Sequence, residues 1–172
     1  MKKLPTRRIA LDGILTAVAL VIHIVEQLVP LPVPVPGVKL GLANVVTLFA
    51  VFAVGRADGG IILLLRILLG SLFAGQVTAL LYSMTGGLLC YGVTILLSFV
   101  LSEKQIWFCG IAGAVVHVVG QIIVAFLLTQ TPEIFFYLPV LVVAAVGTGL
   151  FTGLTAQFVL KAMRDRTDLL PK

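Results

Sequence analysis

One arginine stands in the middle of a strongly apolar run. Arg66 lies within IILLLRILLGSLFAG, residues 61–75, which is otherwise typical of a lipid-facing helix. An arginine at the centre of a membrane helix costs about 2.5 to 3.5 kcal/mol on an insertion scale, so we expect its side chain to face the bundle interior. Two interpretations follow. Arg66 closes an ion pair with Asp12, the better candidate by depth, or with Glu26, or it contacts a bound ligand.

Polar side chains also interrupt other apolar segments. His117 and Gln121 are four residues apart and therefore share one helix face. Lys39 precedes another apolar run, and Asn44 stands at the beginning of that run. Cationic groups match carboxylate or phosphate oxygens, and amides fix the orientation of a ligand, so together these side chains suit an anionic or strongly hydrogen-bonding small molecule. The predicted substrate-binding residues are Lys39, Asn44, Arg66, His117 and Gln121.

The last apolar segment carries small and hydroxyl residues at helical spacing. Gly149 and Gly153 form a GxxxG pattern, which permits close approach of a second helix. Thr148, Thr152 and Thr155 fall on one stripe of the same helix. For these positions we favour close packing and hydrogen bonding to the helix's own carbonyls over a role in binding.

The composition is that of an integral membrane protein. Of 172 residues, 60% are hydrophobic and only 11% are charged, whereas roughly a quarter of an ordinary soluble domain is charged. The mean hydropathy is +1.18 and the isoelectric point is about 9.6. Because the basic residues gather at the two ends of the chain, they are typical of topology signals, and nucleic acid is not an expected partner.

A membrane-spanning helix needs about 20 predominantly apolar residues. Six segments predict an all-α integral membrane protein, a six-transmembrane-helix bundle in which residues 1–172 form a single transmembrane domain. The third segment is short, and a turn at residues 74–76 separates it from the fourth. The predicted spans are about residues 9–29, 38–54, 60–74, 77–101, 107–129 and 138–163.

The positions of lysine and arginine predict the direction of these spans. Lys39 falls in a loop on one side, and the other loop and terminal cations fall on the opposite side. The positive-inside rule then places the N- and C-termini in the cytoplasm, in a multi-pass protein of the plasma membrane. The cations on the predicted cytoplasmic side are Lys2, Lys3, Arg7, Arg8, Arg56, Lys104, Lys161, Arg164, Arg166 and Lys172.

Two loops have distinct predicted structures. Residues 29–41, VPLPVPVPGVKLG, carry alternating prolines that fix φ and lack an amide proton, so we expect an extended cover over the outer face. Residues 55–59, GRADG, predict a tight turn with solvated charges.

Two surfaces are candidates for contacts outside the chain. Gly13 and Ala17 form a small-xxx-small pattern on the first span, which suits docking of a partner helix; packing within the same chain is the alternative. The C-terminal residues 161–172 predict a solvated helix end in contact with anionic lipid.

No signature of a resident metal or cofactor is present in the sequence. Cys90 and Cys109 lie in apolar runs without a CxxC pattern, which favours packing roles. The motif G-x-x-x-x-G-K-[ST] is missing, so an ATP-driven step would have to come from another chain. We therefore expect no catalytic residue, no metal and no cofactor.

Five stretches together resemble the Gx transporter family, also labelled heptaprenyl diphosphate synthase component I. They are PGVKLGLANVVTLFAVFAVG, RILLGSLFAG, LLYSMTGGLL, GAVVHVVGQIIVA and FYLPVLVVAAVGTGLFTG. That family in turn resembles the S components of energy-coupling factor transporters. The resemblance implies six helices, a ligand site toward the outer face, and docking of a transmembrane coupling subunit with its ATPases, for which Gly13 and Ala17 could supply the small-residue patch.

Two functional hypotheses follow from the residues and the resemblance. The preferred one is a membrane subunit that binds a small, anionic or amide-rich compound and moves it inward with an energising partner. The alternative is a non-catalytic membrane partner of a soluble prenyl synthase subunit. Catalytic prenyl synthase subunits use Asp-rich DDxxD motifs, and none of the four aspartates of this chain is adjacent to another, so we expect that it is not an enzyme by itself.

Overall fold

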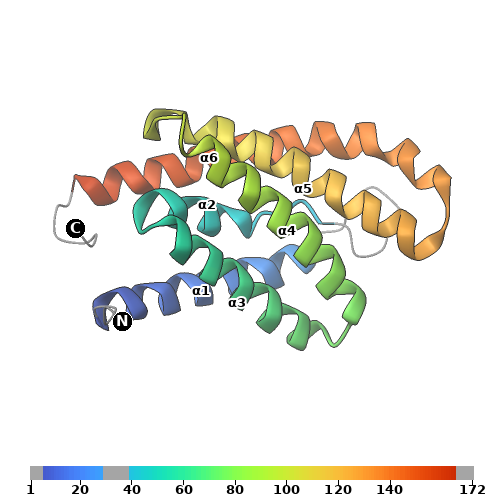
Figure 1. Ribbon diagram of the computed structural model, residues 1–172, viewed down its shortest axis with the longest axis horizontal. Helices are drawn as coiled ribbons and strands as arrows, with labels where there is room; N and C mark the ends of the chain where they lie inside the picture. Colours follow the sequence, from blue (N-terminus) through green and yellow to red (C-terminus); the bar gives the residue numbers. More distant parts are fainter. Residues whose placement is uncertain (1–5, 29–38, 166–172) are drawn as a thin grey trace.

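The computed structural model describes residues 6–28 and 39–165 (Figure 1). These residues are predominantly helical, and no strand occurs among them. The elements are α1 (Thr6–Gln27), α2 (Asn44–Ala53), α3 (Arg56–Ala74), α4 (Val77–Leu97), η1 (Glu103–Gln105), α5 (Ile106–Thr129), η2 (Pro132–Tyr137) and α6 (Leu138–Arg164), where η marks a short 3-10 helix.

Five of the helices are long and apolar enough to cross a membrane, namely α1, α3, α4, α5 and α6. Large apolar side chains such as Ile14 and Val21 of α1 are exposed on the surface of the bundle. A soluble protein rarely leaves so much apolar surface in contact with water, whereas lipid can cover it. The all-helical class and the membrane character expected from the composition agree with this arrangement.

The prediction for the second span is wrong in its extent. We expected a span over residues 38–54, but α2 covers only Asn44–Ala53 and residues 39–43 are not helical. Ten residues at 1.5 Å each give a helix of about 15 Å, roughly half of the hydrocarbon thickness. The helix does not extend toward the N-terminus through Gly41, because the φ of Gly41 is +78°. Residue 38 and the proline-rich residues 29–37 lie outside the described residues.

The turn between α3 and α4 follows the sequence prediction. Gly75 has a φ of +62° and its amide donates to the carbonyls of Ser71 and Leu72, as at many helix C-termini. The start of α3 differs, because Arg56 and Asp58 belong to its first turn. The prediction of solvated charges in residues 55–59 is wrong for Asp58, which is 3% exposed.

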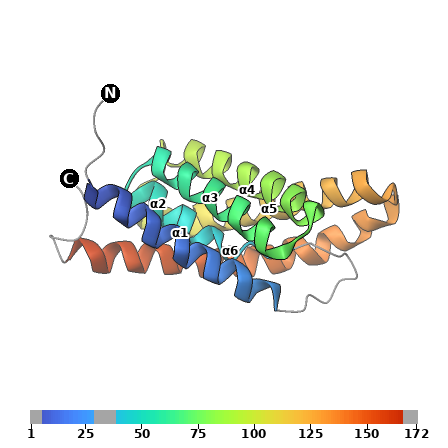
Figure 2. The same ribbon diagram turned by 90° about the horizontal axis from the view of Figure 1, so that it is seen from below.

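The helices pack in two groups, which are joined by α2 and by the contact of α3 with α4 (Figures 1 and 2). α5 packs extensively against α6 and against α4, while α1 packs against α3. The short helix α2 packs against both α3 and α6, so it lies between the groups. This position brings the beginning of α2 close to α1, α3 and α5 at once.

The contact between α5 and α6 depends on glycines. A Cβ added at Gly110 would lie 2.3 Å from the carbonyl oxygen of Gly149 and 2.7 Å from the Cα of Gly153. The GxxxG pattern of α6 is thus a close helix contact, as predicted. Thr148, Thr152 and Thr155 donate their hydroxyls to carbonyls of the preceding turn, in agreement with the structural role expected for them.

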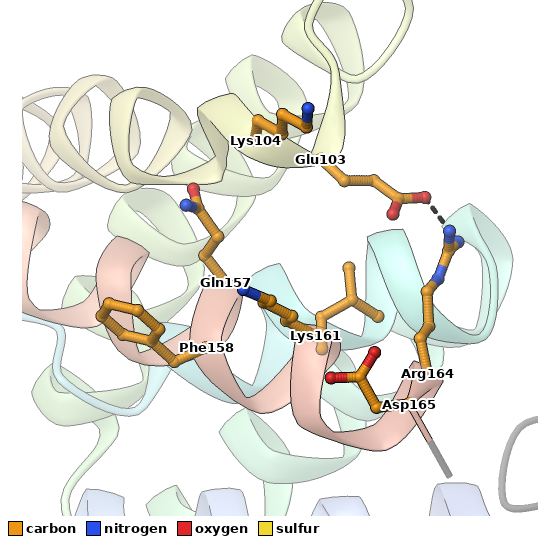
Figure 3. A pocket seen from close by; sticks show the side chains of 8 residues that line it. Glu103, Lys104, Gln157, Phe158, Lys161, Arg164 and Asp165 are labelled. Atoms are coloured by element: carbon orange, nitrogen blue, oxygen red, sulfur yellow. Dashed lines mark ion pairs between the residues drawn. The ribbon is translucent and has the colours of Figure 1, made fainter. Parts of the chain in front are cut away.

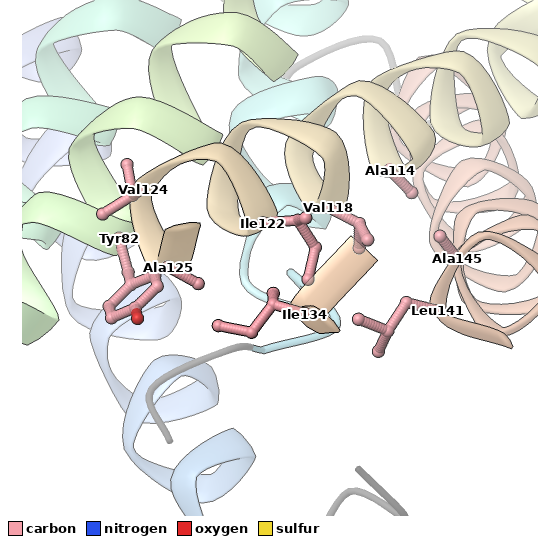
Figure 4. Packing of buried hydrophobic residues seen from close by; sticks show 9 residues of the cluster. All are labelled: Tyr82, Ala114, Val118, Ile122, Val124, Ala125, Ile134, Leu141 and Ala145. Atoms are coloured by element: carbon pink, nitrogen blue, oxygen red, sulfur yellow. The ribbon is translucent and has the colours of Figure 1, made fainter. Parts of the chain in front are cut away.

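An apolar cluster packs along the middle and C-terminal part of α5 (Figure 4). Val118 and Ile122 of α5 pack with Ile134 of η2 and Leu141 of α6, and Tyr82 of α4 closes the cluster. Because lipid is as apolar as these side chains, their contacts stabilise the bundle chiefly through close van der Waals packing. The packing orients α5 so that its polar residues face the remaining helices.

Candidate functional site

Arg66 is buried within the bundle and bonded to an amide. Its side chain is 2% exposed. Nη2 donates to Oδ1 of Asn44 over 3.0 Å. Nε is buried and makes no hydrogen bond to any described residue. A buried guanidinium with an unused donor has residual capacity to bind an acceptor, since buried polar groups are nearly always hydrogen-bonded.

The expected ion pair between Arg66 and Asp12 does not form among the described residues. Asp12 lies near Arg8 and Asp58, where α1 and α3 begin. Asp58 and Arg66 are eight residues apart on α3, which corresponds to about 12 Å along the helix. Asp12 is therefore too close to the helix ends to reach Arg66. Of the two proposed carboxylates, Glu26 is the one that interacts electrostatically with Arg66.

Asn44 joins Arg66 to α5. Its Nδ2 lies 3.2 Å from Nδ1 of His117, which is buried. Two glycines make room for the imidazole ring. A Cβ at Gly41 would lie 3.1 Å from Cδ2 of His117, and a Cβ at Gly86 would lie 2.8 Å from its Nδ1. The ring is therefore held between α4 and the segment that precedes α2.

The segment before α2 is attached to two helices by side chains. The amide of Lys39 donates to Oε1 of Gln121 over 2.9 Å. The amides of Gly41 and Leu42 donate to Oε1 of Glu26 over 2.5 Å and 3.0 Å. Consecutive amides at a helix start form a good anion-binding arrangement. In this structure the carboxylate of Glu26 occupies that arrangement.

Two residues of the site, Glu26 and His23, are absent from the predicted set of binding residues. Glu26 is 5% exposed, and the sequence offered a signal in the form of a carboxylate near the end of an apolar span. His23 is buried against α3, where a Cβ at Gly70 would lie 2.6 Å from its Cδ2. His23 interacts electrostatically with Lys39 and Arg66, so it belongs with the predicted binding residues.

The charges of this polar cluster do not balance. We use the name for Glu26, Lys39, Asn44, Arg66, His117 and Gln121 together with His23. Among the titratable members, Lys39 and Arg66 are cationic and Glu26 is the carboxylate. Burial lowers the pKa of the Lys39 ammonium from its ordinary value, and Arg66 lowers it further, while Glu26 opposes both effects. Excess positive charge in an apolar bundle favours the approach of an anion.

A small cavity borders the polar cluster within the described part of the chain. A cavity of about 10 Å³ adjoins Gly41 and Asn44 on the side of Cys90 and Cys109. That volume is about enough for one water molecule.

The predicted docking residues lie on the surface of α1. Gly13 and Ala17 are both exposed, and a Cβ added at Gly13 would meet no atom within 4 Å. Gly13 therefore makes no close packing contact within the described part of the chain. Within residues 6–28 and 39–165, no group of three His, Cys, Asp or Glu side chains could hold a metal ion.

Comparison with known proteins identifies the family. The family model for heptaprenyl diphosphate synthase component I matches residues 15–159. No curated protein and no solved structure matches the chain. The matched range contains the whole polar cluster, and the numbered name implies a second synthase component. This chain belongs to the heptaprenyl diphosphate synthase component I family.

Proposed function

We propose that this chain is a non-catalytic membrane component of a heptaprenyl diphosphate synthase system. The family match over residues 15–159 is the observation that carries the proposal. The sequence lacks paired aspartates of the DDxxD type, so the elongation chemistry belongs to a separate, soluble subunit. The long prenyl chain is apolar and transfers favourably into lipid. A membrane component would hold the catalytic subunit beside the bilayer that accepts the product.

Reconstitution with the soluble subunit tests this function. The tagged chain is placed in proteoliposomes and mixed with the Asp-rich prenyl synthase subunit of the same organism, an allylic diphosphate primer and isopentenyl diphosphate. We expect co-purification of the two proteins and a several-fold change in the rate of elongation or in product length. Empty liposomes are the control. If rate and product length are the same with and without the chain, the proposal is wrong.

A second candidate function is supported by the polar cluster itself. In this proposal, the chain binds a small anionic compound and moves it inward with an energising partner, as in the S components that it resembles. The supporting observation is the unused Nε donor of buried Arg66 beside the unbalanced charge of the cluster. Guanidinium groups pair well with carboxylate and phosphate oxygens. The ligand would replace the contacts that Glu26 and Gln121 make with residues 39–42.

Extraction of bound small molecules tests the second candidate. The purified wild-type protein, Arg66→Ala and Asp12→Ala are denatured, and their small molecules are compared by mass spectrometry. We expect an anionic compound that is lost with Arg66→Ala and retained with Asp12→Ala. Uptake of that compound by cells should also be lost with His117→Ala. Recovery of lipid alone from all three proteins would refute the binding function.

Both candidates use the same proposed topology. The excess of lysine and arginine in one set of loops supports cytoplasmic termini in a plasma membrane protein. Single cysteines introduced at residues 3 and 170 of a protein lacking Cys90 and Cys109 test it. An impermeant thiol reagent should label neither site in intact cells and both sites after permeabilisation.

A further inference from the structure

A second polar region lies at one end of the bundle, apart from the polar cluster. A pocket of about 500 Å³ opens between η1 and the last turns of α6 (Figure 3). Ligand pockets commonly have volumes of roughly 300 to 1,000 Å³. Because α5 begins directly after η1 and α6 ends at Arg164, the pocket lies where two spans leave the apolar zone. Lipid headgroups occupy this level of a bilayer.

The pocket carries an excess of positive charge. Arg164 pairs with Glu103 across its rim (Figure 3). Lys104 and Lys161 also line the pocket, and neither ammonium group has an ion pair or hydrogen bond with a described residue. With Asp165, the described lining residues hold three cations and two carboxylates. One negative charge in the pocket would therefore balance it.

A neutral acceptor in the same pocket lacks a donor. Oε1 of Gln157 is buried and makes no hydrogen bond to the described residues. A ligand that brings a hydroxyl group would satisfy this oxygen. Phe158, on the adjacent position of α6, is 64% exposed and offers apolar surface beside the opening. The pocket thus combines sites for an anion, for a hydroxyl group and for a hydrocarbon chain.

We infer that this pocket binds the headgroup of an anionic phospholipid. Its phosphodiester lies between Lys104 and Lys161, its hydroxyl donates to Gln157, and an acyl chain runs along Phe158. A phosphodiester carries the single negative charge that balances the lining, and cations at the ends of membrane helices attract anionic lipid. A free diphosphate carries more charge than the lining balances and would be repelled by Glu103 and Asp165. This site is independent of both proposed functions.

Native mass spectrometry in mixed micelles tests the inference. The protein is presented with equal amounts of phosphatidylglycerol and phosphatidylcholine, and bound lipid is counted. We compare the wild type with Lys104→Gln/Lys161→Gln and with a matched control, Lys2→Gln/Lys3→Gln, which removes the same charge at the N-terminal end. We expect one retained phosphatidylglycerol in the wild type and in the control. The pocket variant should bind it about tenfold more weakly, since each lysine contributes a few-fold.

Two further measurements identify what is bound. Gln157→Leu should weaken binding of phosphatidylglycerol without changing that of phosphatidylmethanol, an anionic phosphodiester whose headgroup has no hydroxyl. Inorganic diphosphate is added at millimolar concentration to the lipid-bound protein, and we expect no displacement. If the Lys104→Gln/Lys161→Gln variant and the control variant lose lipid equally, the proposed location of the site is wrong. Displacement by diphosphate, or equal retention of phosphatidylcholine, would overturn the assignment to an anionic lipid headgroup.

Discussion

Two arginines of the bundle show opposite ways of holding a charge. Arg8 of α1 donates through Nε and Nη2 to both carboxylate oxygens of Asp58, over 2.8 Å and 2.5 Å. Arg66 of α3 donates to the neutral amide of Asn44 and keeps Nε without a partner among the described residues. The first charge is balanced within the chain, and the second is not fully satisfied. Arg8 therefore has a structural role, whereas Arg66 retains capacity for an external anion.

Removing Arg8 should have the largest effect on stability. Arg8→Met leaves Asp58, 3% exposed, without its cation and close to Asp12. We expect a loss of about 3 kcal/mol, at the low end for a buried pair because the Arg8 side chain is 32% exposed. Equilibrium unfolding in mixed detergent micelles measures it. Arg8→Met/Asp58→Leu should recover part of the loss, and a variant as stable as the wild type would contradict this account of the pair.

Removing the carboxylate of Glu26 should have the next largest effect. Glu26→Ala leaves the amides of Gly41 and Leu42 without their acceptor, which we expect to cost about 2 kcal/mol. Glu26→Gln keeps an acceptor oxygen and should lose less than half as much. Hydrogen exchange of the amides at residues 41 and 42 checks the mechanism, and it should be faster only in Glu26→Ala. Unchanged exchange would show that Glu26 does not hold this segment.

Two glycine-to-alanine substitutions in α4 test how closely the side chain of His117 is packed. Gly86→Ala places a methyl group 2.8 Å from Nδ1 of His117 and 3.0 Å from its carbonyl oxygen. We expect it to cost about 1.5 kcal/mol, in the range for overpacking. A Cβ at Gly92 meets no atom within 4 Å, so Gly92→Ala should be neutral or stabilising. Equal midpoints of thermal unfolding for the two variants would rule out close packing of the ring.

Removing Arg66 should have the smallest effect on stability. Arg66→Met leaves no carboxylate unpaired, because Glu26 keeps its backbone partners. The variant leaves Oδ1 of Asn44 without its donor, but it also removes a buried charge whose Nε has no partner among the described residues. These two effects oppose each other, so we expect a change below about 1 kcal/mol. Binding of the anionic compound should nevertheless be lost. If Arg66→Met lost as much stability as Arg8→Met, Arg66 would have a structural role like that of Arg8.

Local chemistry was sufficient to predict several features. Five of the six predicted spans are long apolar helices in the described part of the chain, because backbone groups in lipid must be bonded within each segment. Gly75 marked the end of α3, since glycine adopts the left-handed conformation without strain. The length of α2 was not predictable in this way, because an apolar run of residues does not distinguish a full span from a short helix with an extended approach.

The sequence by itself determined the membrane class, the family and the presence of buried polar side chains that need partners. The identity of those partners was decided only by the tertiary structure. The sequence favoured Asp12 over Glu26 as the partner of Arg66 by depth, but helix packing places Asp12 near Arg8 and Glu26 within electrostatic range of Arg66. The physical reason is that hydrogen bonds and ion pairs act over a few ångströms. Only the relative depth and rotation of neighbouring helices bring two groups within that distance.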